Sequence, residues 1–433
     1  MPIEQVTARM VLDSRGRPTV EAEVEITNGA TFIASAPSGA STGSHEAMEL
    51  RDGDPTRWAG QSVERALTGI RSVIGPALIG MDPTEQRRLD LQLVELDGTP
   101  DRSRLGANAI LAVSAACARA GAAALEIPLW EHLADASACT PSLPLPMINV
   151  LSGNLHAAGG MDIQDVLVVP HGAPSYEVAL EWAAGVYRRA GALLRAKGEP
   201  TLVGDEGGYG LVGGNSKQGI DLVVEAIVGE GLVPGVDMSI ALDVAGAHLL
   251  ADDGRYRLDG DVLEGSEFIE RLVGWCHQSP ICSIEDPLGE DAWDLWSEFV
   301  SSTRRFELQV LGDDLIVTHL DRLQRAIDTG AANAVLVKAN QVGTISEALE
   351  VAGRAAAHGF RAVVSARSGE TEDDWLADLA IASGAGQIKV GSLVRSERLA
   401  KYNRLLRVGE RASDLRYAGG GPTLPLPELA HCG

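Results

Sequence analysis

Residues 281–286 read Ile281-Cys282-Ser283-Ile284-Glu285-Asp286, a short, mostly apolar run that ends on carboxylates. Similar runs, each followed by a charged residue, recur at intervals of about 20 to 40 residues through the second half of the chain. Amphipathic helical patterns separate them, and this alternation favours parallel strands covered by helices. The runs are 239–242, 281–284, 308–311, 334–337, 361–365 and 387–390.

The charged residues at the ends of these runs predict a shared cavity. In a (β/α)8 barrel the carboxyl ends of the strands all face one mouth, where the chemistry is built. One charged strand end is usually a solvated loop residue, but six in succession are hard to explain in that way. The sequence therefore predicts an α/β fold whose mouth gathers three carboxylates and three cations: Asp243, Glu285, Asp313, Lys338, Arg367 and Lys389.

The first third of the chain has a different pattern, which predicts an α+β domain. Apolar and polar side chains alternate with the period of a half-buried strand, and Asn28-Gly29 is a strong hairpin signal. Apolar residues at helical spacing follow. The predicted elements are strands at 19–26 and 31–34 and helices at 61–74 and 106–125.

A Pro-rich stretch at 141–146 is the best candidate for a boundary between the two patterns. We therefore expect an N-terminal α+β capping domain over residues 1–138 and a barrel domain over residues 139–433.

Composition excludes some partners. The 433 residues carry a net charge of −24. Nucleic acids and anionic membranes are bound by clustered Lys and Arg, so we expect neither as a partner.

The apolar stretch 107–129 is interrupted by Arg119 and Glu126, which predicts a packed helix rather than a membrane span. The five cysteines form no Cys-x-x-Cys pair and residues 1–4 do not begin a signal peptide, so we expect free thiols and a cytoplasmic location.

The predicted mouth suits proton abstraction beside a carboxylate. Three carboxylates favour Mg²⁺ or Mn²⁺, and zinc is disfavoured because no His/Cys set lies nearby. Close positive charge and partial burial are expected to lower the pKa of Lys338, which would make it a usable general base. Arg367 and Lys389 could hold a phosphate and a carboxylate. Glu206, on the Gly-flanked loop 204–208, is a candidate general acid.

Long segments of the chain resemble enolase. The resemblance runs in one order over nearly the whole length, which makes it highly specific. It is carried by Asp13–Glu21, Pro37–Gly43, Leu50–Asp54, Gly106–Leu111, Gly204–Gly208, Ser283–Pro287, Gly312–Leu315, Arg367–Asp373 and Ala400–Asn403.

The resemblance implies a capping domain followed by a variant (β/α)8 barrel of enolase type. It also implies two Mg²⁺ ions, the second arriving with substrate, and a homodimer or higher homo-oligomer. The implied reaction is the interconversion of 2-phosphoglycerate and phosphoenolpyruvate, so the expected partner is a small phosphorylated or phosphonylated three-carbon acid.

The resemblance also assigns roles residue by residue. Lys338 matches the base that removes the C2 proton, and Glu206 matches the acid that helps to expel the C3 hydroxyl, with Asp165 beside it. The ligands of the first metal match Asp243, Glu285 and Asp313, and Ser41 matches the ligand of the second. The substrate contacts match His156, Gln164, Arg367, Ser368 and Lys389.

Two matched positions depart from the family pattern. The family has Ser-His where this chain has Ser365-Ala366, and Gln-Glu where it has Gln164-Asp165. The loop around His156 also differs. The intact metal ligands and Lys338 favour ordinary dehydration. The departures favour a relative with the same enolate chemistry on an altered substrate, such as a carboxyphosphonoenolpyruvate synthase-like enzyme of phosphonate biosynthesis.

Two other classes are weaker alternatives. Residues 208–213 match G-x-G-x-x-G, the motif of a dinucleotide-binding oxidoreductase, but no clear Rossmann-type strand precedes them. A non-catalytic scaffold descended from an enzyme would be expected to have lost metal ligands, yet all three carboxylates remain.

Overall fold

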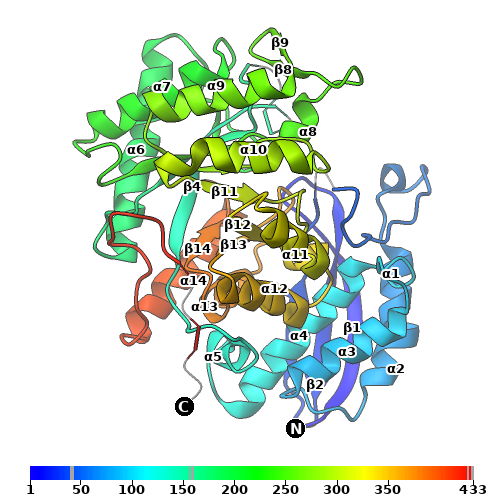
Figure 1. The fold of residues 1–433 in the computed structure, drawn as a ribbon. Coiled ribbons are helices and arrows are strands. Elements are labelled where there is room, and N and C mark those ends of the chain that lie inside the picture. Colours follow the sequence, from blue (N-terminus) through cyan, green and yellow to red (C-terminus); the bar gives the residue numbers. More distant parts are fainter. Residues whose placement is uncertain (40–42, 155, 158–159, 427–428, 431–433) are drawn as a thin grey trace.

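The computed structural model describes residues 1–39, 43–154, 156–157, 160–426 and 429–430. Figure 1 shows an N-terminal unit, in blue and cyan, beside a barrel that extends from green to red. The N-terminal unit contains an antiparallel sheet of β1 (Ile3–Leu12), β2 (Pro18–Ile26) and β3 (Thr31–Ser35) in that order. The strands predicted at 19–26 and 31–34 are therefore confirmed.

Helices cover this sheet. The apolar helix α4 (Ala107–Leu125) packs on β2 and β3, and most of its residues are buried. The helix predicted over 61–74 is present from Glu64 to Leu78, with a π-helical turn at Ile70–Ile74 in its middle, just before Pro76, which has no amide hydrogen to donate. The elements are a 3₁₀ turn at Trp58–Gly60, α1 (Glu64–Gly69), α2 (Gly75–Leu78), α3 (Gln86–Asp97), α4 (Ala107–Leu125) and α5 (Leu129–Ala134).

Eight strands close into the barrel, because the last strand, β14, pairs with the first, β4. All six predicted runs form parallel barrel strands. The strands are β4 (Leu145–Ser152), β5 (Asp165–Val169), β7 (Ser239–Asp243), β10 (Ile281–Glu285), β11 (Gln309–Gly312), β12 (Ala334–Val337), β13 (Arg361–Ser365) and β14 (Gln387–Lys389).

One strand departs from the uniform alternation of strand and helix. β5 pairs antiparallel with both β4 and β7, because the chain turns directly back after β4 without a crossover helix. A two-residue strand, β6 (Tyr209–Gly210), pairs with the end of β4 outside the closed ring. Residues 208–213 include this two-residue strand itself and do not follow a full-length strand, which is the context that a dinucleotide-binding motif requires.

Helices surround the barrel and a small hairpin extends from it (Figure 1). The elements are α6 (Tyr176–Ala196), α7 (Ser216–Gly229), α8 (Gly246–Leu249), the hairpin β8 (Tyr256–Leu258) and β9 (Asp261–Leu263), α9 (Gly265–Gln278), α10 (Trp293–Thr303), α11 (Leu320–Thr329), α12 (Ile345–Ala357), α13 (Trp375–Ala382), α14 (Ser396–Arg411) and 3₁₀ turns at Arg304–Phe306 and Ala339–Gln341.

Apolar side chains fill the barrel interior, so it is a packed core rather than a pore. Leu145, Leu167 and Leu336, from three different strands, are all buried in this cluster. Gln309 and Gln387 add a polar layer in which each amide donates to the other. Four cysteines are free thiols, three of them buried, and Cys432 lies outside the described residues.

Candidate active site

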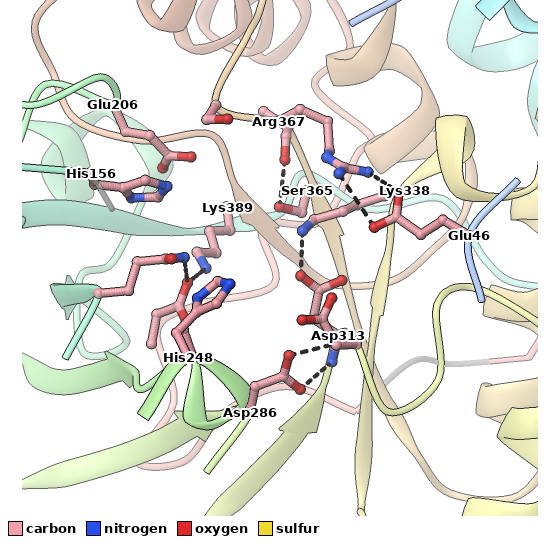
Figure 2. Close-up of a pocket in the computed structure, with 16 residues that line it drawn as sticks. Glu46, His156, Glu206, His248, Asp286, Asp313, Lys338, Ser365, Arg367 and Lys389 are labelled. Atoms are coloured by element: carbon pink, nitrogen blue, oxygen red, sulfur yellow. Dashed lines mark hydrogen bonds and ion pairs between the residues drawn. The ribbon is translucent and has the colours of Figure 1, made fainter. Parts of the chain in front are cut away.

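The charged strand ends meet at one mouth of the barrel, as the sequence predicts. Figure 2 shows Lys338, Asp313 and Arg367 on one side of a cavity and His156 and Glu206 on the other. The cavity has a volume of about 40 Å³. Of the residues predicted for the site, it is lined by His156, Gln164, Glu206, Asp243, Asp313, Lys338, Ala366, Arg367, Ser368 and Lys389.

Lys389 lies between two of the predicted metal ligands. Its Nζ is 2.7 Å from Asp243 Oδ2 and 2.6 Å from Glu285 Oε2. Gln164 Nε2 also donates to Asp243, at 3.1 Å. Burial and the charge of Asp243 raise the pKa of Glu285 well above its usual range, against the opposing effect of Lys389. This part of the mouth thus holds more negative charge than the protein itself neutralises.

Lys338 forms an ion pair with the third predicted ligand, Asp313, which also accepts from Gln341 Nε2 at 2.9 Å. The expectation of a lowered lysine pKa is not met by the protein groups alone. Burial lowers the pKa of Lys338, but the carboxylate of Asp313 outweighs it and the net shift is upward. The sequence argument counted the neighbouring cations and did not foresee this direct contact.

Asp286 holds the end of β11 in place. Its two carboxylate oxygens accept from the backbone amides of Asp313 and Asp314, at 2.9 and 2.8 Å. Burial raises the pKa of Asp286 well above its usual range, and the charge of Asp314 adds to this effect. The place of Asp286 beside Glu285 in the sequence gives no sign of these two contacts.

On the opposite side, His156 and Asp165 form a buried pair, with His156 Nδ1 2.8 Å from Asp165 Oδ2. The other oxygen of Asp165 accepts from Ser152 Oγ at 2.8 Å and from Asn149 Nδ2. Burial lowers the pKa of His156, but Asp165, Glu206 and other nearby acids raise it to a net value of about 9. The imidazole is therefore charged at neutral pH.

Asp165 does not line the cavity, although the sequence analysis expected it to act there beside Glu206. It is completely buried behind His156, and burial raises its pKa against the effect of His156. We therefore assign Asp165 as a positioning residue. Glu206 does face the cavity, and His156, Arg398 and Lys389 lower its pKa against the opposing effect of burial.

Arg367 connects the barrel to the N-terminal unit. Its Nη1 donates to Glu46 Oε2 at 2.7 Å, and both side chains are at most 5% exposed. Arg398 donates to the carbonyls of Arg367 and Ser368, at 2.6 and 2.7 Å, and Arg15 donates to Ser368 Oγ at 3.3 Å. Glu46 has no role in the sequence analysis, although its place just after loop 37–43 is a usable signal.

The donor set fits a hard divalent cation. Asp243, Glu285 and Asp313 present buried carboxylate oxygens, and the ammonium groups of Lys338 and Lys389 balance only part of their charge. Oxygen ligands are what Mg²⁺ prefers. Ser41, the residue expected to bind a second metal, lies outside the described residues.

Two further cavity residues have no assigned role. Ala366 lines the cavity at the position where the family has a histidine. His248 points an imidazole into the cavity from the short helix α8, which follows β7 (Figure 2). It lies five residues after Asp243, a spacing with no periodic signal, so only the fold reveals its position.

Family models cover nearly all of the chain. The model of the N-terminal domain of enolase matches residues 3–133, and that of the enolase C-terminal TIM barrel domain matches residues 140–423. Together with the fold, these matches define an enolase-type lyase. The chain belongs to the enolase family.

Proposed function

We propose that this protein is a Mg²⁺-dependent lyase that removes the C2 proton of 2-phosphoglycerate, or of a close analogue, and eliminates water to give phosphoenolpyruvate. The observation that carries the proposal is the placement of Lys338 and Glu206 on opposite sides of one cavity (Figure 2), which the buried carboxylates of Asp243 and Asp313 also line. Such an arrangement gives a base and an acid separate access to adjacent carbons.

The side chains divide the reaction between them. Arg367 and Ser368 would bind the phosphate, and Lys389 the carboxylate. Lys338 Nζ, in its neutral amine form, would take the proton from C2, and the electron pair of that bond would become the C2–C3 double bond. Glu206, in its protonated form, would donate a proton to the leaving C3 hydroxyl, so the C3–O bond breaks with release of water.

The bound metal would be held by Asp243, Glu285 and Asp313, with Ser41 as the proposed ligand of a second ion. When bound, Mg²⁺ supplies positive charge that stabilises a doubly charged carboxylate. His156, held by Asp165, would keep a positive charge beside Glu206, and Gln164 would orient Asp243. We further propose a cytoplasmic homodimer or higher homo-oligomer, with neither nucleic acid nor membrane as a partner.

A second candidate is the same enolate chemistry on an altered substrate, as in a carboxyphosphonoenolpyruvate synthase-like enzyme. The observation that favours it is Ala366, a methyl group on the cavity wall where the family has an imidazole. The loss of a ring leaves room for a larger group and removes a hydrogen-bonding partner.

The test supplies 2-phosphoglycerate and Mg²⁺ to the native protein and to Ala366→His. Phosphoenolpyruvate formation is followed by absorbance, and C2 proton exchange in D₂O by NMR. Native turnover supports dehydration. Exchange without turnover, with turnover gained in Ala366→His, supports the altered substrate. Absence of both exchange and turnover in the native protein contradicts the proposal.

A further inference from the structure

His248 brings to the catalytic cavity a side chain that the proposed function does not use. Its imidazole makes no hydrogen bond or ion pair with any residue that the structure describes, and the residue is exposed. Desolvation in the cavity mouth lowers the pKa of His248, against the opposing charge of Asp243. At neutral pH the ring is therefore uncharged, with one N–H donor and one nitrogen acceptor available to a ligand.

The backbone that carries His248 is held in a fixed place. Ala245, whose φ is 49°, has a left-handed conformation that is costly for a residue other than glycine. The amide of Gly246 donates to the carbonyl of Asp286 at 2.8 Å, and a Cβ at Gly246 would lie 2.7 Å from the carbonyl oxygen of Pro287. Strain of this kind persists where the surrounding structure fixes it, and it is common at functional sites. The start of α8 is thus locked against the segment that follows β10.

His248 faces the end of the cavity where the C3 group of a substrate would lie. Figure 2 shows it on the side away from Arg367, the proposed phosphate contact. Asp243 and His156 are close enough to act on the charge of its imidazole. With the phosphate on Arg367 and the carboxylate on Lys389, the group of the acid that remains to face this side is the C3 hydroxyl.

We propose that His248 is a specificity-determining residue whose imidazole N–H donates a hydrogen bond to the C3 oxygen of the bound three-carbon acid. It gives the cavity a second imidazole beside His156, whereas the family pattern has one at position 366, where this chain has only the methyl group of Ala366. The inference rests on the proposed function, because it adds one contact to the same site. Acids with an oxygen on C3 are the ligands that this contact selects.

The first test asks whether a bound acid covers the imidazole of His248. Diethyl pyrocarbonate modifies neutral imidazoles, and mass spectrometry follows the rate at His248 and at His358, an exposed histidine at the end of α12. With Mg²⁺ present, 2-phosphoglycerate at about ten times its dissociation constant should slow the modification of His248 about tenfold. The rate at His358 should not change, and Mg²⁺ alone should protect neither histidine.

The second test asks which atom of the acid the imidazole contacts. 2-Phospholactate is 2-phosphoglycerate without the C3 hydroxyl, so it cannot accept the proposed hydrogen bond. His248→Ala should weaken the binding of 2-phosphoglycerate about tenfold and that of 2-phospholactate much less. His248→Asn keeps an N–H donor and should recover part of the loss, and His358→Ala is the control.

Affinities come from KM and competitive inhibition constants, or from calorimetry where turnover is absent, and thermal unfolding checks each variant. The contact requires both results. An unprotected His248, or equal weakening of both acids in His248→Ala, overturns it. Protection is measured on the native protein, so a variant that fails to fold does not decide the outcome.

The result for the proposed function is separate. Turnover of 2-phosphoglycerate without protection of His248 keeps the proposed function and overturns the role of this residue. Protection, with discrimination between the two acids, but without turnover or C2 exchange, supports the contact and counts against dehydration. Binding of neither acid overturns both proposals.

Discussion

The two sides of the catalytic cavity are built from different kinds of structure. Asp313, Lys338 and Arg367 follow three adjacent parallel strands, β11 to β13. Across the cavity, His156 and Glu206 come from loops, and the side chain behind them, Asp165, begins the antiparallel strand β5. The departures at Asp165 and around His156 lie on the loop side. Ala366 follows β13 on the strand side, next to Arg367, and the proposed metal ligand and base on that side are kept.

The contrast suggests which part of the chemistry is constrained. The proposed base, Lys338, and the proposed metal ligand, Asp313, follow neighbouring strands and cannot be moved independently, because the strand register sets their spacing. Loop residues can change without disturbing the sheet, so specificity is more easily altered there. We therefore expect proton abstraction on the strand side to be separable from the later step on the loop side.

The largest expected effect is on the strand side. Lys338→Ala removes the proposed base, so C2 proton exchange of 2-phosphoglycerate in D₂O should fall about 10³-fold or more. NMR follows the exchange, and a Mg²⁺ titration checks that metal binding remains. Lys217→Ala, which changes a lysine on α7, should behave as the native protein. Exchange that persists in Lys338→Ala would show that another group is the base.

A smaller effect is expected across the cavity. Glu206→Gln removes the proposed acid, so phosphoenolpyruvate formation should fall about 10²-fold while C2 exchange is retained. The two rates are measured on the same sample, and Glu225→Gln on α7 is the control for loss of one carboxylate. If Glu206→Gln lowered C2 exchange and elimination equally, Glu206 would not act only in the later step.

The next prediction tests Asp165 as a positioning residue. Asp165→Asn removes the negative charge that holds His156, so the pKa of His156 should fall from about 9 toward its ordinary value. NMR titration of the imidazole measures the change. Elimination should weaken more than C2 exchange, and Asp165→Glu, the residue of the family pattern, should keep the raised pKa. If the pKa of His156 were unchanged in Asp165→Asn, Asp165 would not be the residue that holds the charged His156.

The smallest effect concerns stability. The folded-state pKa of His156, about 9, exceeds its unfolded value of about 6.5. The charged imidazole therefore contributes stability that is fully present below about pH 6.5 and is lost as the pH rises through about 9. The difference in unfolding free energy between the native protein and His156→Gln should shrink over this window, as measured by urea denaturation at several pH values. If this difference in unfolding free energy did not change with pH, His156 and Asp165 would not form an ion pair.

The sequence predicted the strands of the barrel correctly, but it did not predict how those strands pair or which side chains meet. The six apolar runs were located correctly because a barrel strand is a local pattern, and the βα repeat places strand ends at one mouth. The reversed direction of β5 was missed, since pairing direction depends on the connection and not on the strand itself. The raised pKa of Lys338 was also missed, because it follows from direct contact with Asp313.

By itself, the sequence determined the barrel, the antiparallel hairpin of the N-terminal sheet, the identity of the six strand-end charges and the resemblance to enolase. These follow from residue order, since periodicity and motifs are local along the chain. Only the tertiary structure decided that Glu46 meets Arg367, that Asp165 lies behind His156 and that His248 lines the catalytic cavity. Such contacts join segments far apart in sequence, and their distances depend on how helices, strands and loops pack together.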